Sequence, residues 1–300
     1  MSNLSSDHRA LLFGLGAVLC WSTVATAFKI ALSLVDTYQL LFLAVLTASV
    51  ILLTLVLFKF GVTTLVRNFS SQWKLTLLAG LLNPIVYYHL LFRAYDLLPA
   101  QVALSINYSW AIVLTLMAVV FLKQKIQRID FVAAGVCYAG VVIIATGGNF
   151  TSLQVENSTG VMLALLSTFV WAAYWILNIR DAREPMVGLC LNFLVALPVT
   201  TAGCYVFSDF DMPLNGVLAA SYVGVAEMAA GFLCWSTALK LSNNASRVSN
   251  LVFLSPFISL VFIHFILKEP VTIVTLAGLM LIVAGLICQQ LVHERSGSVT

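Results

Sequence analysis

Charge is scarce in this chain. Asp, Glu, Lys and Arg together make up 9% of its 300 residues, whereas a soluble domain carries roughly 25%. Hydrophobic residues account for 61%, so too little charge is available to cover the surface of a water-soluble fold. This composition excludes a soluble enzyme, a nucleic-acid-binding protein and a disordered chain. It predicts an all-α polytopic membrane protein that lies in a lipid bilayer.

Motifs for catalysis, metal binding and nucleotide binding are also missing. The sequence contains no HExxH, GxSxG or Walker A lysine loop. Each cysteine lies within an apolar run, with neither CxxC nor metal-ligand spacing; they are Cys20, Cys137, Cys190, Cys204, Cys234 and Cys288. We therefore expect no catalytic residue, no metal, no cofactor and no ATP-driven pump in this chain.

What the sequence has instead is a series of long apolar runs separated by short polar breaks. About 20 apolar helical residues cross a bilayer core roughly 30 Å thick. The runs predict ten transmembrane helices, at about 10–34, 38–58, 74–95, 100–122, 130–147, 160–179, 186–207, 216–240, 246–267 and 271–291. The connections between them are too short to hold a further domain.

Basic residues are distributed unevenly among these connections. With the N-terminus inside, most of the 15 Lys and Arg fall on the cytoplasmic side, for example Arg67, Lys123 and Arg183, while the outer connections carry acidic residues such as Asp209. Positive charge marks the cytoplasmic side of a membrane protein. We therefore expect a multi-pass protein with both termini cytoplasmic.

The two halves of the chain resemble each other. Residues 80–83 (Gly-Leu-Leu-Asn) align with 224–227 (Gly-Val-Ala-Glu), and 121–125 align with 266–270. Five spans per half is an odd number, so the second half enters the membrane from the opposite side. The expected architecture is two inverted five-helix repeats, 1–150 and 151–300, around a central cavity. Secondary transporters use this arrangement and bind substrate near mid-membrane.

The ends of the repeats carry a further signal. The stretch from Ser255-Pro256 to Lys268-Glu269-Pro270 is matched more weakly by Trp110-Ala111 to Lys123-Gln124-Lys125. With these motifs the chain resembles the EamA-type members of the drug/metabolite transporter superfamily over nearly its whole length. It departs from their pattern at Ala111, where Pro is usual, and at Gln124, where Glu is usual.

Two shorter motifs resemble one branch of that superfamily. Residues 107–110 (Asn-Tyr-Ser-Trp) and 169–174 (Phe-Val-Trp-Ala-Ala-Tyr) are similar to bacterial exporters of aromatic amino acids. The resemblance implies a basket of ten helices with a central cavity in the plasma membrane (the bacterial inner membrane), and export of amino acids or related metabolites.

Glu227 is the ionisable residue closest to the middle of a predicted span. An ionisable group in the bilayer is expensive and needs a functional or structural reason. Its helical neighbours Gly224, Ala230 and Gly231 are small, so the carboxyl group borders a cavity or packs against another helix. The hypotheses are a substrate-ammonium or proton site, and a protonated side chain bonded between helices. Its repeat mate Asn83 is polar too, which points both residues towards the pseudo-symmetric centre.

Aromatic and amide side chains complete the expected substrate site. Trp171, Tyr174 and Trp175 share one helical face, and they line the cavity or pack between helices. The further candidates are Trp21, Tyr87, Asn107, Trp110 and Asn250. The two asparagines should face inward because an amide in lipid is disfavoured; they contact either substrate or another helix.

Several charged or titratable residues lie near the outer ends of the spans. His89, Arg93 and Asp96 form one stripe, which is either a solvated helix end or an outer gate. Lys29 is either a residue that reaches towards the membrane surface or a cation of the cavity. The candidate gate residues are Lys29, His89 and Arg93.

The sequence thus predicts a secondary transporter, not an enzyme, that exports amino acids, aromatic ones among them, or related small metabolites by alternating access. A facilitative channel or a membrane receptor is the alternative, and a membrane-embedded enzyme is a third. Proton coupling and facilitative transport both stay open. The expected partners are a small-molecule substrate and the lipid bilayer, without nucleic acid, and the protein is a monomer or a homodimer.

Overall fold

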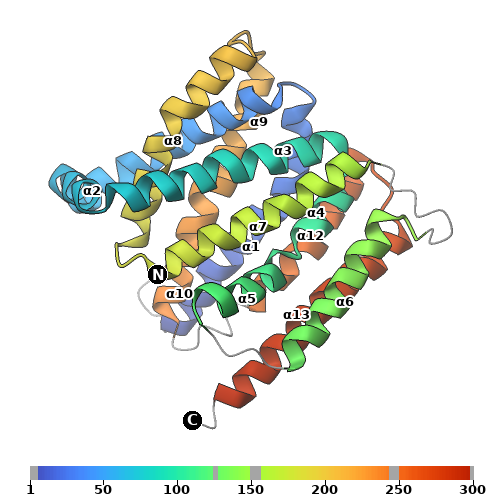
Figure 1. Ribbon diagram of the computed structural model, residues 1–300. Helices are drawn as coiled ribbons and strands as arrows, with labels where there is room; N and C mark the ends of the chain where they lie inside the picture. The colour runs from blue at the N-terminus through green and yellow to red at the C-terminus, as the bar shows by residue number, and fades with distance from the viewer. Residues whose placement is uncertain (1–5, 124–127, 149–156, 243–249, 298–300) are drawn as a thin grey trace.

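The computed structural model describes residues 6–123, 128–148, 157–242 and 250–297, and every regular element in these residues is helical. The longer helices are α1 (Ser6–Leu32), α2 (Thr37–Gly80), α3 (Tyr87–Leu97), α4 (Ala100–Asn107), α5 (Trp110–Phe121), α6 (Arg128–Ala145), α7 (Ser158–Arg180), α8 (Pro185–Phe207), α9 (Leu214–Val223), α10 (Phe232–Leu241), α12 (Ser255–Phe262) and α13 (Ile273–Gly297). Short π-helical or 3-10 segments join some of them: η1 (Leu81–Val86), η2 (Gly224–Gly231), η3 (Asn250–Leu254) and η4 (Ile263–Leu267). Figure 1 shows these helices packed into one bundle.

Eight helices in the described residues are long and apolar enough to cross a membrane. This is fewer than the ten expected from the sequence. The expected spans 38–58 and 74–95 fall within one continuous stretch of 61 residues, Thr37–Leu97. The expected span 246–267 begins outside the described residues and continues as the shorter apolar helix Leu251–Leu267.

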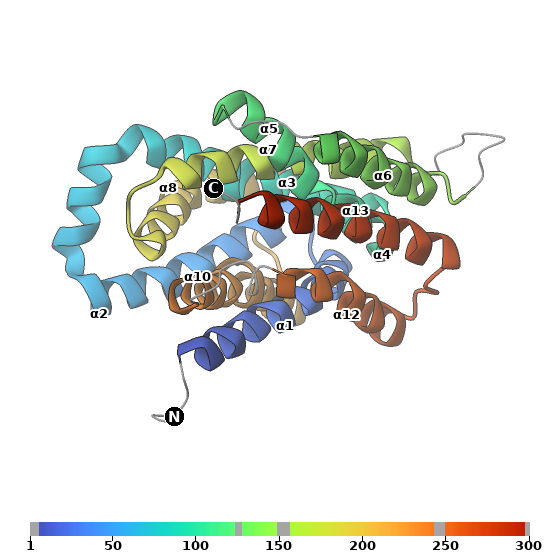
Figure 2. The same cartoon turned by 90° about the horizontal axis from the view of Figure 1, so that it is seen from below.

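The stretch of 61 residues is not straight. A straight helix of that length would measure roughly 90 Å, about three times the thickness of a bilayer core. Its backbone leaves the helical conformation at Gly61 (φ 76°) and at Gln72 (φ −134°). A positive φ is accessible to glycine because it has no Cβ. Figure 2 shows the chain running outward along α2, turning at the edge of the molecule, and returning towards α3.

Helices of the two halves of the sequence pack against each other. The main neighbours are α2 with α8, α6 with α13, α1 with α10, and α3 with α7. In each pair one helix comes from before residue 150 and the other from after it. Figure 1 shows α6 and α13 side by side at one edge of the bundle. The halves therefore interleave.

Small residues allow some of these helices to approach closely. A Cβ atom on Gly224 of η2 would lie 2.5 Å from the Ala44 carbonyl oxygen of α2. A Cβ on Gly140 of α6 would lie 2.5 Å from the Gly278 carbonyl oxygen of α13. Glycine at a helix interface allows backbones to approach closely, as is common in membrane bundles.

Candidate functional site

A cavity of about 370 Å³ lies between helices of both halves. This volume is within the usual range of sites for small molecules, about 300–1,000 Å³. Most of its wall is aromatic or aliphatic, with one carboxyl group and two amides. The lining comprises Trp21, Val24, Ala25, Phe28, Tyr87, Leu91, Tyr95, Leu104, Asn107, Tyr108, Trp110, Ala111, Leu114, Trp171, Trp175, Glu227, Phe232, Trp235, Val252, Phe253, Leu286 and Gln290. We call this space the central cavity.

Trp171 of α7 is the centre of an aromatic cluster on one side of the central cavity. Its ring stacks on Tyr87 of α3, with the ring centres 4.4 Å apart. The rings of Trp110 and Trp175 meet it edge-on at 6.4 and 6.0 Å. The Trp171 side chain is largely buried, and its neighbours fix its orientation. It therefore presents a rigid aromatic surface to the cavity.

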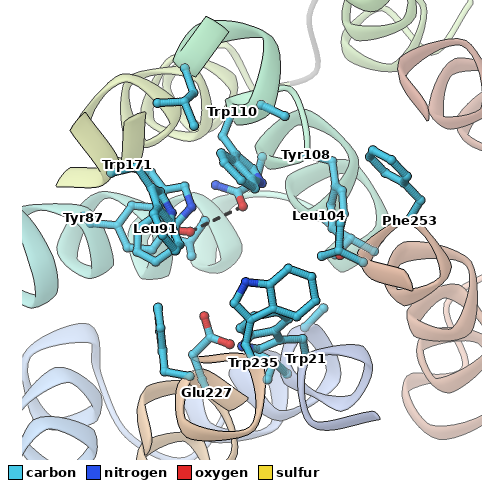
Figure 3. A pocket seen from close by; sticks show the side chains of 18 of the residues that line it. Trp21, Tyr87, Leu91, Leu104, Tyr108, Trp110, Trp171, Glu227, Trp235 and Phe253 are labelled. Carbon is cyan, nitrogen blue, oxygen red and sulfur yellow. Dashed lines mark hydrogen bonds between the residues drawn. The ribbon is translucent and has the colours of Figure 1, made fainter. Parts of the chain in front are cut away.

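A second aromatic cluster faces the first. The ring centre of Trp21 of α1 lies 5.4 Å from that of Trp235 and 6.0 Å from that of Phe232, both on α10. Figure 3 shows Trp21, Trp235 and Glu227 on one side of the cavity, with Trp171, Tyr87 and Trp110 opposite. Both clusters line the central cavity.

Glu227 brings a carboxyl group into this aromatic surrounding. It belongs to η2, the π-helical segment between α9 and α10, and its side chain lines the cavity. Its Oε1 accepts a hydrogen bond of 3.0 Å from the hydroxyl of Tyr88, which is completely buried. The carboxyl group thus both borders the cavity and is held by a partner on α3, a combination of the two arrangements considered from the sequence.

Asn107 of α4 supplies the amide of the site. Its Nδ2 donates to the Ser167 hydroxyl at 3.1 Å, and its Oδ1 accepts a long hydrogen bond of 3.4 Å from the Tyr87 hydroxyl. It therefore connects α4 to α7 and α3 while lining the cavity. Contact with the cavity and contact with other helices again occur together.

Several expected site residues are elsewhere. Asn83 is completely buried and is not part of the cavity wall. It lies in η1 with extended backbone angles (φ −139°, ψ 116°), so helical periodicity does not predict its direction. Tyr174 is buried beside Asn192, whose Nδ2 donates to its hydroxyl at 3.4 Å. The side chain of Asn250 is outside the described part of the structure.

The three gate candidates do not reach the central cavity. The Lys29 ammonium donates to the carbonyl oxygens of Tyr95 and Leu98, at 2.9 and 3.1 Å, and so binds the C-terminal end of α3. Arg93 pairs with Asp96 at 2.7 Å, and both side chains are exposed. The ring of His89 packs against Tyr38, with centres 5.1 Å apart. Arg93 and Asp96 have the geometry of a solvated helix end.

Sequence reasoning missed Tyr88, Phe232 and Trp235. Phe232 and Trp235 are separated by three positions, which is a helical signal for one shared face. The bond from Tyr88 to Glu227 joins residues 139 positions apart. No local pattern indicates such a pair.

Comparisons with known proteins agree with a membrane transport function. The EamA-like transporter family matches residues 8–146 and again 158–289. The uncharacterized transporter YvbV of Bacillus subtilis strain 168 is 26% identical over 227 residues, which cover 72% of each chain. The aromatic amino acid exporter YddG of Ancylobacter novellus is 23% identical over 239 residues, covering 78% of this chain and 81% of that protein.

The fold also has a counterpart among solved structures. One crystal structure superimposes with a TM-score of 0.69 at 20% sequence identity, covering 96% of this chain and 99% of the other. This likeness concerns the helical fold. The two family matches together span most of the sequence, and apolar helices long enough to cross a bilayer recur along it. The chain is a multi-pass membrane transporter with a small-molecule substrate, and it belongs to the EamA-like transporter family.

Proposed function

We propose that this transporter exports amino acids, aromatic ones in particular, through the central cavity. The observation that carries the proposal is the combination of one carboxyl group, Glu227, with two facing clusters of aromatic rings. A carboxylate attracts the substrate ammonium, and the ring of the substrate stacks against Trp171 or Trp21. Each aromatic pair contributes about 0.5–1.5 kcal/mol beyond the burial of area.

The proposal includes ten membrane crossings in two inverted units, 1–150 and 151–300. The reversal of Thr37–Leu97 at Gly61 supports two crossings in that stretch. The shorter apolar helix Leu251–Leu267 is the ninth crossing along the chain and brings the total to ten. The π-helical segments η1 and η2 contain Asn83 and Glu227, which the sequence repeat aligns. The two separate family matches also support two units.

Alternating access requires one side of the central cavity to close while the other opens. In the proposed topology, with both termini cytoplasmic in the bacterial inner membrane, the start of α4 and the η4–α13 connection lie on the outer side. Ala100 N donates to Glu269 Oε2 at 3.0 Å, and Gln101 Nε2 donates to the Pro270 carbonyl oxygen at 2.8 Å. These bonds join the two halves, so release of substrate to the outside requires that they break.

Proton coupling is part of the proposal, with Glu227 as the titrating group. The carboxylate neutralises a bound ammonium in one state, and a proton replaces that ammonium after release. Its partner Tyr88 keeps the carboxyl group oriented in both states. No second copy of the chain is needed for this cycle, which supports a monomer as the transporting unit.

Transport of labelled amino acids by proteoliposomes tests the function. We expect saturable transport of phenylalanine and tryptophan, with weak competition from alanine. Trp171→Phe should weaken apparent affinity for aromatic substrates by about 2- to 10-fold, since it reduces the stacking surface. Trp73→Ala is the control because Trp73 is exposed and is not among the residues that line the cavity. Equal transport of alanine and phenylalanine, unaffected by Trp171→Phe, would contradict the proposed substrate class.

A further inference from the structure

A second cavity lies beside the central one. It has a volume of about 270 Å³ and is formed by the end of α7, the start of α8, and α10. Its lining comprises Tyr174, Trp175, Asn178, Ile179, Asp181, Arg183, Pro185, Gly188, Leu189, Phe232, Trp235, Ser236, Leu239 and Lys240. We call it the inner cavity, because the α7–α8 connection is cytoplasmic in the proposed topology.

Three aromatic side chains belong to the walls of both cavities. Trp175, Phe232 and Trp235 line the central cavity and also the inner cavity. They therefore form a partition between the two spaces. The partition is packed against the aromatic clusters of the central cavity. The ring centres of Phe232 and Trp171 are 5.8 Å apart, and those of Trp235 and Trp21 are 5.4 Å apart. Movement of a side chain in this partition would join the two cavities.

The other end of the inner cavity carries charges of both signs. Arg183 Nη2 pairs with Asp181 Oδ2 at 2.7 Å, and the Arg183 side chain is almost completely buried. Arg183 Nη1 also donates to the Thr76 hydroxyl at 2.6 Å, which fixes the guanidinium between α2 and α8. Lys240 pairs with Glu184 at 2.5 Å, and this pair is more exposed.

The inner cavity thus joins aromatic rings at one end to positive and negative groups at the other. A zwitterion with an apolar side chain has the complementary distribution. Its ring would contact Trp175 and Trp235, while its carboxylate and ammonium groups would face Arg183, Lys240 and Asp181. The ion pairs already neutralise one another, so the cavity attracts neither pure cations nor pure anions strongly.

We propose that the inner cavity is a second binding site for the same zwitterionic substrate, in series with the central cavity. Substrate from the cytoplasm occupies it first and reaches the central cavity when the partition of Trp175, Phe232 and Trp235 opens. This inference rests on the proposed function and deepens it. It assigns a role to the charged α7–α8 connection, which no contact with the central cavity explains.

Filling the inner cavity tests whether substrate passes through it. Ser236 lines only the inner cavity, and Ser236→Trp introduces an indole there. The matched control is Leu218→Trp, since Leu218 of α9 is 62% exposed on the outside of the bundle. Two quantities are compared: equilibrium binding of labelled phenylalanine to purified protein, and its transport by proteoliposomes.

The two quantities respond differently because an equilibrium constant does not depend on the path to the site. We expect Ser236→Trp to bind phenylalanine at the central cavity with a dissociation constant within about 2-fold of wild type, while kcat/KM for transport falls by about 10-fold or more. Leu218→Trp should leave both unchanged. Normal transport by a folded Ser236→Trp protein would overturn the inference and leave the proposed function standing.

Cysteine labelling gives a test that needs neither transport nor tolerance of tryptophan. Ser236→Cys is made in a background where the three cysteines that are not fully buried, Cys20, Cys234 and Cys288, are alanine. A membrane-impermeant thiol reagent should label it in inside-out vesicles and not in right-side-out vesicles, and phenylalanine should slow the labelling. Leu218→Cys is the unlabelled control.

Absence of labelling from the cytoplasmic side would overturn the inference, even with active transport. Labelling that phenylalanine does not slow would also overturn it, provided that wild type binds phenylalanine. If wild type binds none, the proposed substrate class fails separately, and the labelling still decides whether the inner cavity opens to the cytoplasm.

Discussion

Glu227 shows how one residue satisfies two requirements inside a membrane. A carboxyl group there needs a partner, and the buried hydroxyl of Tyr88 supplies one at 3.0 Å. Its remaining hydrogen-bonding capacity faces the central cavity. The residue is therefore oriented by the protein and still free to bind a ligand.

Glu227→Gln separates charge from shape at this position. Glutamine retains an oxygen that accepts from Tyr88, so we expect a folded protein with near-normal thermal stability. The attraction for an ammonium group is lost. Because hydrogen bonds to charged groups contribute about 1.5–3 kcal/mol, the KM for phenylalanine should rise by about 10- to 100-fold, and transport should no longer respond to pH. Proteoliposome assays at pH values roughly one unit below and one unit above neutral measure both quantities.

Tyr88→Phe is the complementary variant, since it removes the hydrogen bond and keeps the carboxyl group. It should retain more transport than Glu227→Gln. Normal, pH-dependent transport by Glu227→Gln would show that Glu227 serves only as a structural partner.

At the scale of elements, the two halves are held together by close helix packing and by side chains of one half that hydrogen-bond to a helix end of the other. Gly224 of η2 lies directly against the Ala44 carbonyl oxygen of α2. The helix α4 begins after Pro99, which provides no side-chain cap, and Glu269 from the other half accepts from its first N–H group. Each feature supports a specific prediction.

Gly224→Ala should destabilise the protein. The added methyl group would lie 2.5 Å from the Ala44 carbonyl oxygen and 2.8 Å from Thr47 Cβ, and overpacking of this kind costs about 1–3 kcal/mol. Gly135→Ala in α6 is the control, because its Cβ would meet nothing within 4 Å. Thermal unfolding in detergent measures both; equal melting temperatures would refute the close approach of η2 and α2.

Glu269→Ala should weaken the outer closure. Loss of an N-terminal cap costs about 0.5–2 kcal/mol, and here the cap also joins the two halves. We expect a lower melting temperature and faster labelling of a cysteine at Ala25, which lines the central cavity, by an impermeant reagent added outside. Asp211→Ala, at an exposed position, should change neither. Unchanged labelling in Glu269→Ala would contradict the proposed closure.

At the scale of the whole molecule, the membrane topology depends on how many times the chain crosses the bilayer. Eight helices are long and apolar enough to cross it in the described residues, and the proposal of ten crossings divides one of them at Gly61. This division determines which connections face the cytoplasm.

Reporter fusions test this membrane topology directly. Fusions after Arg67 and Arg183 should be active as cytoplasmic reporters, and those after Val35 and Asp209 as periplasmic reporters. The expectation follows from the positive-inside rule and from the reversal of the chain near Gly61. Cytoplasmic activity at both Val35 and Arg67 would mean that α2 does not cross the membrane as proposed, and the inverted repeat would fail.

Much of the central cavity was predictable because its residues are unusual for a membrane span. Glu227 is expensive in lipid, and Trp171 and Trp175 share a helical face. The structure brings these three together with Trp21, Tyr87, Asn107 and Trp110 in one lining. The sequence predicted that these residues share one site, but not which side chains contact each other within it.

The parts of the site and fold that were not predicted depend on features that the helical periodicity of the sequence does not reveal. In η1 and η2 the π-helical turns shift the register of the side chains, so Asn83 is outside the lining while Tyr87 and Glu227 are within it. The helical nature of the chain followed from its apolar runs. The polar residues between 59 and 73 indicated a connection; the structure keeps most of this connection helical and changes the direction of the chain at Gly61 and Gln72, which the sequence pattern did not indicate.

The interleaving of the halves has a consequence for synthesis. Every main helix pair joins a segment made early to one made late. When residue 150 leaves the ribosome, α1, α2, α3 and α6 have only their neighbours from the first half and still lack their main packing partners. Final assembly waits for α13, the last long helix of the chain. The first half inserted alone would therefore lack the helix contacts that hold the complete bundle together.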